Sequence, residues 1–280
     1  MPSKAKAPEF GSQEYWDQRF TTNTAPFDWL SAPDALDPLI TDALRTSNQE
    51  QPQLLHIGCG SSLLSQHLKN HVESPRQVHN VDYSSVVIEA ERRRESESVG
   101  GNVDACARWD AVDLLNYASL NEACGQSMYS VIVDKSTADA ISCADDVSCH
   151  LPYAICTEER TVANDLTKAG HKSVLIHPLH LLAVHLAYVA KPGAKWISLS
   201  YTAERFPFLD DVEVATTTKN AATDTEIPDP RILWTVVGKH QIEAKEEGNM
   251  GGVAHRPKVY HWLYILQRTS TQLYNVTDRP

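Results

Sequence analysis

Two glycines and one acidic residue in the first third of the chain have the spacing of a nucleotide-binding site. The apolar run Leu54–Ile57 leads into Gly58 and Gly60, and Asp82 follows 22 residues after the second glycine. Glycine lets the backbone approach a ligand closely, and an acid at this position hydrogen-bonds ribose hydroxyls. The turn lacks the third glycine of the dinucleotide fingerprint. This combination favours an adenosyl ligand without a pyrophosphate, with S-adenosylmethionine as the candidate.

Both features also have simpler explanations. Gly58 and Gly60 can form a tight strand-to-helix turn without a ligand, and Asp82 can cap the helix expected at Ser85–Ser96. A cap accounts for the residue type at position 82, but it does not account for the register with the glycine turn. We therefore favour a ligand site and keep the capping role as the alternative.

The sequence around this turn alternates between strand and helix patterns. The expected strands are Leu54–Ile57, Gln77–Val81, Ala105–Trp109, Tyr129–Val133, Trp196–Tyr201, Ile232–Val237 and Tyr260–Gln267. The expected helices are Gln13–Phe20, Ala35–Leu44, Leu63–Asn70, Ser85–Ser96 and His180–Val189. This order predicts an α/β fold with a seven-stranded Rossmann-like sheet that is mostly parallel and closes in a C-terminal antiparallel hairpin.

One long segment, residues 142–178, fits no part of this alternation. It exceeds an ordinary strand-to-helix connection, and such inserts are usually functional or disordered. We expect it to form a lid over a substrate. The domain organisation is then a disordered leader over residues 1–12 and a single domain over residues 13–280.

Composition narrows the class of protein. The chain of 280 residues is 42% hydrophobic, enough for one large core, and its formal charge of −11 argues against a nucleic-acid partner. No apolar run approaches the roughly 18 residues of a membrane helix. The six cysteines form neither a CxxC pair nor a His-spaced zinc pattern, so we expect no metal centre and a reducing, cytoplasmic location.

Five segments, in the same order, resemble class I S-adenosylmethionine-dependent methyltransferases. They are Glu14–Phe20, Phe27–Trp29, Gly58–Ser62, Val81–Val87 and Asp134–Ala140. The chain is most similar to a subgroup that includes elongation factor 1-alpha lysine methyltransferases. Similar sequences also occur as N-methyltransferases of fungal secondary metabolism, in gliotoxin-type epidithiodiketopiperazine pathways. The resemblance covers residues 13–142 and, more loosely, 180–268. It implies a seven-stranded methyltransferase sheet, an N-terminal helical cover and an insert after the fourth strand.

The resemblance also implies S-adenosyl-L-methionine as cofactor, S-adenosyl-L-homocysteine as product, and a set of residues that hold the cofactor. Aromatic rings enclose it, the glycine turn lies beneath it, Asp82 takes the ribose, and the remaining residues border the adenine and the mouth of the site. The implied residues are Trp16, Phe20, Trp29, Gly58, Gly60, Asp82, Tyr83, Asp113, Leu114 and Lys135. Alternatives remain for three of them. Trp16 and Trp29 can be core residues that fasten the N-terminal helix, and Asp113 can be a cap.

Two departures from the subgroup lie where the acceptor is expected to bind. Phe20 stands where lysine methyltransferases of this group often have tyrosine, and Ser136-Thr137-Ala138 replaces Gly-Thr-Leu. No catalytic residue is assigned. Lys135, His150 and Tyr153 are the candidates for orienting or deprotonating an acceptor, with wall or loop roles as the alternative.

Three hypotheses follow for the function. The first is an N-methyltransferase that acts on a small molecule, a diketopiperazine-like amide or amine of a fungal secondary metabolite, with the insert as its lid. The second is a protein lysine methyltransferase acting on an elongation factor 1-alpha-like protein. The third, a methyltransferase fold without catalysis, is disfavoured by the intact glycine, Asp82 and Asp113 positions. We favour the first because both departures and the insert concern the acceptor.

Overall fold

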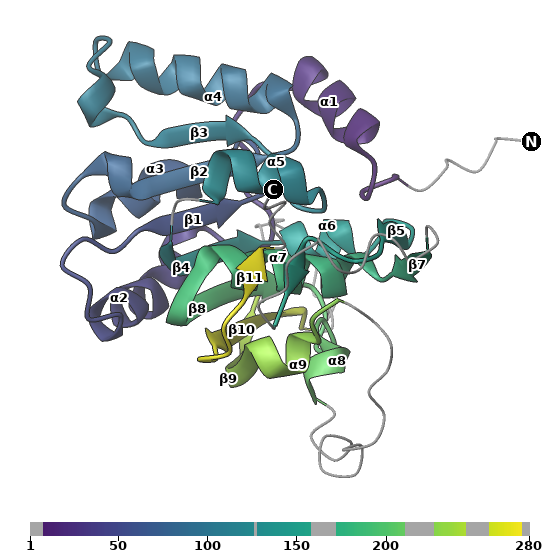
Figure 1. Ribbon diagram of the computed structural model, residues 1–280. Helices are drawn as coiled ribbons and strands as arrows, with labels where there is room; N and C mark the ends of the chain where they lie inside the picture. Colours follow the sequence, from purple (N-terminus) through teal and green to yellow (C-terminus); the bar gives the residue numbers. More distant parts are fainter. Residues whose placement is uncertain (1–7, 126–127, 158–171, 211–226, 245–257, 276–280) are drawn as a thin grey trace, which may run out of the picture.

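The computed structural model describes residues 8–125, 128–157, 172–210, 227–244 and 258–275. Its centre is a seven-stranded sheet with the strand order β3-β2-β1-β4-β8-β10-β9 (Figure 1). These strands are β1 (Leu54–Ile57), β2 (Val78–Asp82), β3 (Arg108–Ala111), β4 (Tyr129–Lys135), β8 (Ala190–Ser200), β9 (Trp234–Glu243) and β10 (Tyr260–Arg268). The first five strands in this order are parallel to one another, and β10 is antiparallel to both of its neighbours. The predicted sheet and its terminal hairpin are confirmed.

Helices cover both faces of the sheet. They are α1 (Gln13–Thr22), α2 (Asp37–Thr46), α3 (Leu64–Leu68), α4 (Ser85–Ser98), α5 (Tyr117–Cys124), α6 (Thr137–Ile141), α7 (Pro178–Val189), α8 (Pro207–Asp210) and α9 (Pro230–Leu233), with short 3-10 turns at Pro33–Leu36, Lys69–His71, Pro75–Gln77 and Val103–Ala105. Side chains of α2, α3 and α4 form one core cluster, whereas those of α5, α6 and α7 form the other. Within the described residues, no helix has the length and apolar character to cross a bilayer.

The alternation of side chains along each strand explains why both faces must be covered. Leu54 packs into the α2–α4 cluster and Leu55 into the α5–α7 cluster, and β4 divides in the same way between Val131 and Ile132. Strands β1, β2 and β4 are buried along their whole length. Continuous burial of apolar strands is typical of parallel sheets enclosed by helices.

The expected insert contains short strands of its own. β5 (Val147–His150) pairs antiparallel with β7 (Ser173–Ile176), and β6 (Ile155–Cys156) pairs with β11 (Tyr274–Asn275). Residues 158–171 of the insert lie outside the described residues. In Figure 1, β5 and β7 lie beside α6, and α1 lies beyond the same edge of the sheet.

Several boundaries differ from the sequence-based expectations, and β8 differs most, because it begins at Ala190 rather than at Trp196. β3 begins at Arg108 rather than at Ala105, and the strand expected from Ile232 begins at Trp234, because Pro230–Leu233 forms α9 with Asp229 as its cap. Residues 1–7 of the expected leader lie outside the described residues. Phe10 belongs to the same expected leader, but its ring packs against the rings of Trp16 and Trp29.

One buried carboxylate connects α4 to its surroundings and gives the first prediction. The Glu95 side chain accepts hydrogen bonds from Lys69 Nζ at 2.5 Å, Trp109 Nε1 at 2.5 Å and the backbone nitrogen of Ala107 at 3.1 Å. We expect Glu95→Ala to lower the free energy of unfolding by roughly 3 kcal/mol, because it leaves a partly buried ammonium without its partner. Denaturant unfolding measures this, and the exposed Glu97→Ala on the same helix is the control. An effect equal to that of the control would contradict the assignment.

Candidate active site

A cavity of about 1010 Å³ lies beyond the carboxyl ends of β1, β2 and β4. This is the edge at which open α/β sheets bind ligands. The cavity brings together every residue that the sequence analysis proposed for the cofactor, and it also contains His150 and Tyr153. We call one part of it the insert side, defined by the lining residues Ser136, Asp139, Val147, Ser148, Cys149, His150, Pro152, Tyr153, Ala154, Tyr201 and Arg205.

Both the backbone conformation at positions 58 and 60 and the space around them require glycine. Gly58 and Gly60 have φ values of +54° and +49°, in the left-handed region that side chains disfavour. A Cβ atom at Gly58 would lie 2.3 Å from Thr137 Oγ1, and one at Gly60 would lie 3.3 Å from Phe20 Cζ. Thr137 also donates to the carbonyl of Ile57 at 2.9 Å. The turn is therefore held between the start of α6 and the ring of Phe20.

Asp82 connects this turn to the end of β2. Its Oδ2 accepts from the backbone nitrogen of Gly60 at 3.0 Å, and its Oδ1 accepts from that of Ser84 at 2.9 Å. The second bond forms a turn just before α4, whose N-cap is Ser84, so Asp82 is not the helix cap. The first bond ties Asp82 to the glycine turn. Burial raises the pKa of this carboxyl to about 6. Burial likewise raises the pKa of the adjacent Tyr83 phenol.

Aromatic rings from α1 and the following loop form one contiguous cluster along the cavity. Trp16 stacks on Phe20 with ring centroids 5.7 Å apart and meets Trp29 edge-on at 6.3 Å. The Arg19 guanidinium lies 4.9 Å from the ring centroid of Phe27 and 5.6 Å from that of Trp29. These rings pack against one another and border the cavity, so the core and ligand roles proposed for them are compatible.

The Lys135 side chain is bound to residues 26–31, a loop that carries Phe27 and Trp29 and that we call the aromatic loop. Its ammonium pairs with Asp28 and donates to the carbonyl of Ser31 at 3.2 Å, and only 3% of its side chain is exposed. Asp28 also accepts from Ser62 Oγ beside the glycine turn. Although burial lowers the pKa of Lys135, the ion pair opposes that shift. The neighbouring Asp134 has other partners, since it accepts from Ser198 Oγ and from backbone nitrogens of α6.

Asp113 makes a local turn in the loop after β3 rather than a helix cap, because Asn116 caps α5. Asp113 Oδ1 accepts from the backbone nitrogen of Leu115 at 2.9 Å, and its own backbone nitrogen donates to Ser119 Oγ. Asp113 and Leu114 both line the cavity, so the turn also places them at its wall.

A buried tyrosine–histidine pair lies on the insert side. His185 Nδ1 is 2.6 Å from the carbonyl oxygen of Leu114, which can only accept, so this nitrogen carries the proton. His185 Nε2 is then the acceptor for the Tyr153 hydroxyl, and the two rings stack at 6.0 Å. Burial lowers the pKa of His185 to about 4, which keeps the ring neutral. His185 lies within the apolar pattern of α7, and that pattern does not predict a polar role for it.

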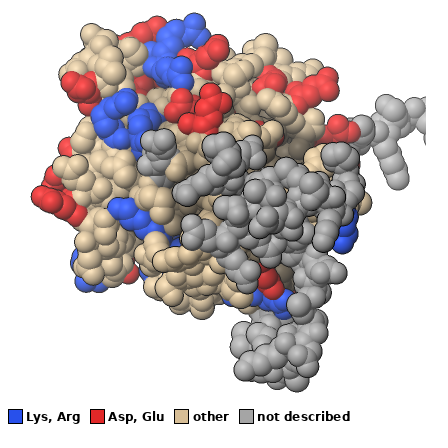
Figure 2. Space-filling model, viewed as in Figure 1, with Lys and Arg blue, Asp and Glu red and all other residues tan. Residues whose placement is uncertain are grey.

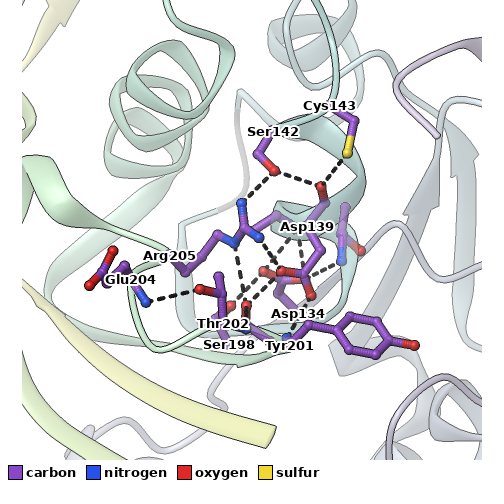
Figure 3. A network of polar contacts seen from close by, with 12 residues as sticks. Asp134, Asp139, Ser142, Cys143, Ser198, Tyr201, Thr202, Glu204 and Arg205 are labelled. Atoms are coloured by element: carbon purple, nitrogen blue, oxygen red, sulfur yellow. Dashed lines mark hydrogen bonds and ion pairs between the residues drawn. The ribbon is translucent and has the colours of Figure 1, made fainter. Parts of the chain in front are cut away.

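A second polar network crosses the insert side (Figure 3). Arg205 pairs with Asp139 Oδ1 at 2.6 Å, and Ser200 Oγ donates to the same oxygen at 2.6 Å. The other oxygen of Asp139 accepts from the backbone nitrogen of Tyr201 at 3.1 Å. Both oxygens of this carboxylate are thus engaged. Asp139 falls within a segment that carried the family resemblance, but its partner lies 66 residues later, so the pair was not predicted.

Ser136 combines two unfavourable features at the cavity wall. Its φ is +66°, and its hydroxyl is buried without a hydrogen-bond partner in the part of the chain that the structure describes. A non-glycine residue in the left-handed region costs about 1–3 kcal/mol, and an unsatisfied buried hydroxyl adds to that cost. Such strain is typical of ligand-binding positions.

Comparisons with known proteins agree with this architecture, although no protein-family model matches the chain. The chain is 34% identical over 236 residues to the methyltransferase srdJ of Neurospora crassa, covering 81% of this chain and 84% of that protein. It is 25% identical over 197 residues to the EEF1A lysine methyltransferase 4 of Bos taurus, covering 69% of this chain and 62% of that protein.

Among solved structures, a SAM-dependent methyltransferase from Anabaena variabilis shares the fold. Its TM-score is 0.51 at 10% identity, over 94% of this chain and 96% of that chain. This likeness supports the seven-stranded architecture, whereas the identity and coverage with srdJ decide the family. The chain belongs to the class I S-adenosylmethionine-dependent methyltransferases.

Proposed function

We propose that this enzyme methylates a nitrogen of a small, largely uncharged molecule, such as an amide or amine of a fungal secondary metabolite. The observation that carries the proposal is the single cavity that extends from the glycine turn to the insert side. Its volume is at the upper end of the range for one drug-sized ligand, roughly 300–1,000 Å³, as expected where cofactor and acceptor bind together. Similarity to a Neurospora crassa methyltransferase supports a fungal setting, and six free thiols support a reducing, cytoplasmic one.

The proposed roles on the cofactor side follow from the contacts of the residues there. S-adenosylmethionine supplies an electrophilic methyl group when bound. Asp82 offers its carboxylate to the ribose, and the rings of Trp16, Phe20 and Trp29 exclude water from the sulfonium region. Lys135 acts as a positioning residue, because its pair with Asp28 fixes the aromatic loop. Alignment in a dry pocket can contribute roughly 7–11 kcal/mol to such a displacement.

On the insert side the polar groups that line the cavity include hydroxyls and the ring of His150, whereas the carboxylate of Asp139 is paired. The Ser136 hydroxyl has no partner among the described residues, and the Tyr153 hydroxyl oxygen retains acceptor capacity while its proton is held by His185. We propose that these two hydroxyls orient the nucleophilic nitrogen. Tyr153 is not proposed as a base, because burial raises its pKa and thereby keeps the phenol protonated.

The charges on the insert side argue against a lysine acceptor. A lysine arrives as an ammonium, and a free carboxylate on the insert side would attract it. Asp139 is engaged on both oxygens and neutralised by Arg205. On the face shown in Figure 2, acidic and basic side chains are interspersed among the described residues. Protein lysine methylation nevertheless remains the second candidate, because the bovine relative is named for it.

The first experiment separates the two acceptor classes. The purified enzyme is incubated with methyl-labelled S-adenosylmethionine together with a fungal metabolite extract or, separately, a soluble fungal proteome. We expect enzyme-dependent label in the small-molecule fraction, at a nitrogen that mass spectrometry can locate. Label confined to protein lysines would contradict the proposal and support the second candidate.

Asp82 gives a prediction about pH. Because its pKa is about 6, the carboxylate is ionised at neutral pH and becomes protonated as the pH falls. We expect affinity for S-adenosylhomocysteine, measured by calorimetry, to weaken roughly tenfold from about pH 8 to about pH 5. Asp82→Asn should bind at least about tenfold more weakly and lose most of this pH dependence. The exposed Asp104→Asn is the control, and an unchanged pH profile in Asp82→Asn would refute the role.

Ser136 gives a prediction in which stability and activity change in opposite directions. Ser136→Gly removes both the left-handed strain and the unsatisfied hydroxyl, so we expect the free energy of unfolding to rise by about 1 kcal/mol or more. Transfer of label to the small-molecule fraction should fall, with affinity for S-adenosylhomocysteine unchanged.

Asn48→Gly is the matched control for this variant. Asn48 has a φ of +51° and is exposed, and it does not belong to the cavity lining. The control should gain stability without loss of transfer. If Ser136→Gly also keeps full transfer, its hydroxyl does not contact the acceptor.

A further inference from the structure

Three metal-ligating side chains converge away from the cavity. Asp37 begins α2, whereas His67 lies in α3 and His71 in the 3-10 turn that follows it. The Nε2 atoms of both histidines contact the same carboxylate oxygen, Asp37 Oδ1, that of His71 at 2.9 Å. One ligand atom from each residue lies within 4.8 Å of the others. None of the three lines the active-site cavity.

The chemistry of this cluster suits a transition metal. The two histidines are four positions apart on consecutive helical turns, so both rings project from one face, with centroids 5.5 Å apart. Two imidazole nitrogens and one carboxylate oxygen form a donor set that zinc accepts, with water in the fourth position of a tetrahedron. The second ring nitrogen of His71 lies 3.4 Å from Thr41 Oγ1, which leaves Nε2 directed at Asp37.

Access and spacing are also compatible with an ion. The side chains of His67, His71 and Asp37 are 25%, 13% and 37% exposed, so an ion can reach them from solvent. Ligand atoms around a tetrahedral zinc are about 3.3 Å apart, given bond lengths of about 2.0 Å. His71 Nε2 lies 2.9 Å from Asp37 Oδ1 and His67 Nε2 lies closer to the same oxygen, so both contacts must open to admit the ion.

We propose that Asp37, His67 and His71 form a binding site for a divalent transition metal, with zinc as the preferred ion. The site joins the start of α2 to the end of α3. The helix α3 follows the Gly58–Gly60 turn, and α2 follows the aromatic loop and the 3-10 turn at Pro33–Leu36. Metal binding therefore fastens together two segments that both lead to the cofactor side of the cavity. Its role is structural, since the ligands lie outside the cavity lining.

The test uses the full-length chain without an affinity tag, after dialysis against a chelator. Zinc chloride is titrated by calorimetry, and cobalt chloride is followed by its visible absorption, which reports the coordination directly. We expect one zinc per chain, an intense cobalt spectrum of tetrahedral type, and a higher melting temperature with zinc. His67→Gln and His71→Gln should each weaken zinc binding by at least about tenfold and abolish the cobalt spectrum.

Two further variants serve as a control and as a second test of the site. The exposed His240→Gln on β9 should bind zinc as the unchanged protein does, which controls for adventitious histidine binding. Asp37→Asn removes the charged ligand without deleting either imidazole, so it tests the site if a histidine variant fails to fold. Absence of saturable zinc binding, or equal binding by the unchanged protein and by Asp37→Asn and the folded histidine variants, would overturn the proposal.

Discussion

The architecture of this site depends on the contacts that β2 and β4, the two strands flanking β1, make with one glycine turn. Asp82, at the end of β2, holds the backbone nitrogen of Gly60, and Thr137, just after β4, fills the space that a side chain at Gly58 would need. The turn, the carboxylate and the start of α6 therefore take their positions together. Since all three border the cavity, any change that moves the turn also moves the groups proposed to hold the cofactor. This coupling explains why the cofactor side carries the recognisable motifs.

The insert side differs from the cofactor side in how its polar groups are paired. Its charged groups are already paired, as in Asp139 with Arg205, and the proton of its buried tyrosine is directed to a neutral histidine. What remains for a ligand includes the hydroxyl of Ser136, the ring of His150 and the apolar walls contributed by residues such as Val147 and Pro152. A site of this kind selects by shape and by a few hydrogen bonds rather than by attraction of a charge. It is suited to a small acceptor, which is the basis of the proposed function.

Much of the fold follows from local sequence, whereas the partners of the site residues do not. The apolar runs at Leu54–Ile57 and Tyr129–Val133 predict buried parallel strands, and the spacing to Asp82 predicts the cofactor edge. Pairing of Lys135 with Asp28 spans 107 positions, and the Asp37–His67 contact spans 30, so both depend on tertiary packing. His185 was missed because an apolar helix pattern gives no sign of a polar role. The short polar strand β3 was misplaced because Arg108 and Asp110 interrupt any apolar pattern.

We propose that cofactor and acceptor share one cavity, with the ribose at Asp82 and the reacting sulfur facing the insert side. A crystal structure of the chain with S-adenosylhomocysteine tests this claim most directly. We expect ribose hydroxyls within hydrogen-bond distance of Asp82, adenine beside Tyr83 and Leu114, and the sulfur open towards Ser136 and Tyr153. Electron density for the ligand outside this cavity, or with its sulfur walled off from the insert side, would contradict it.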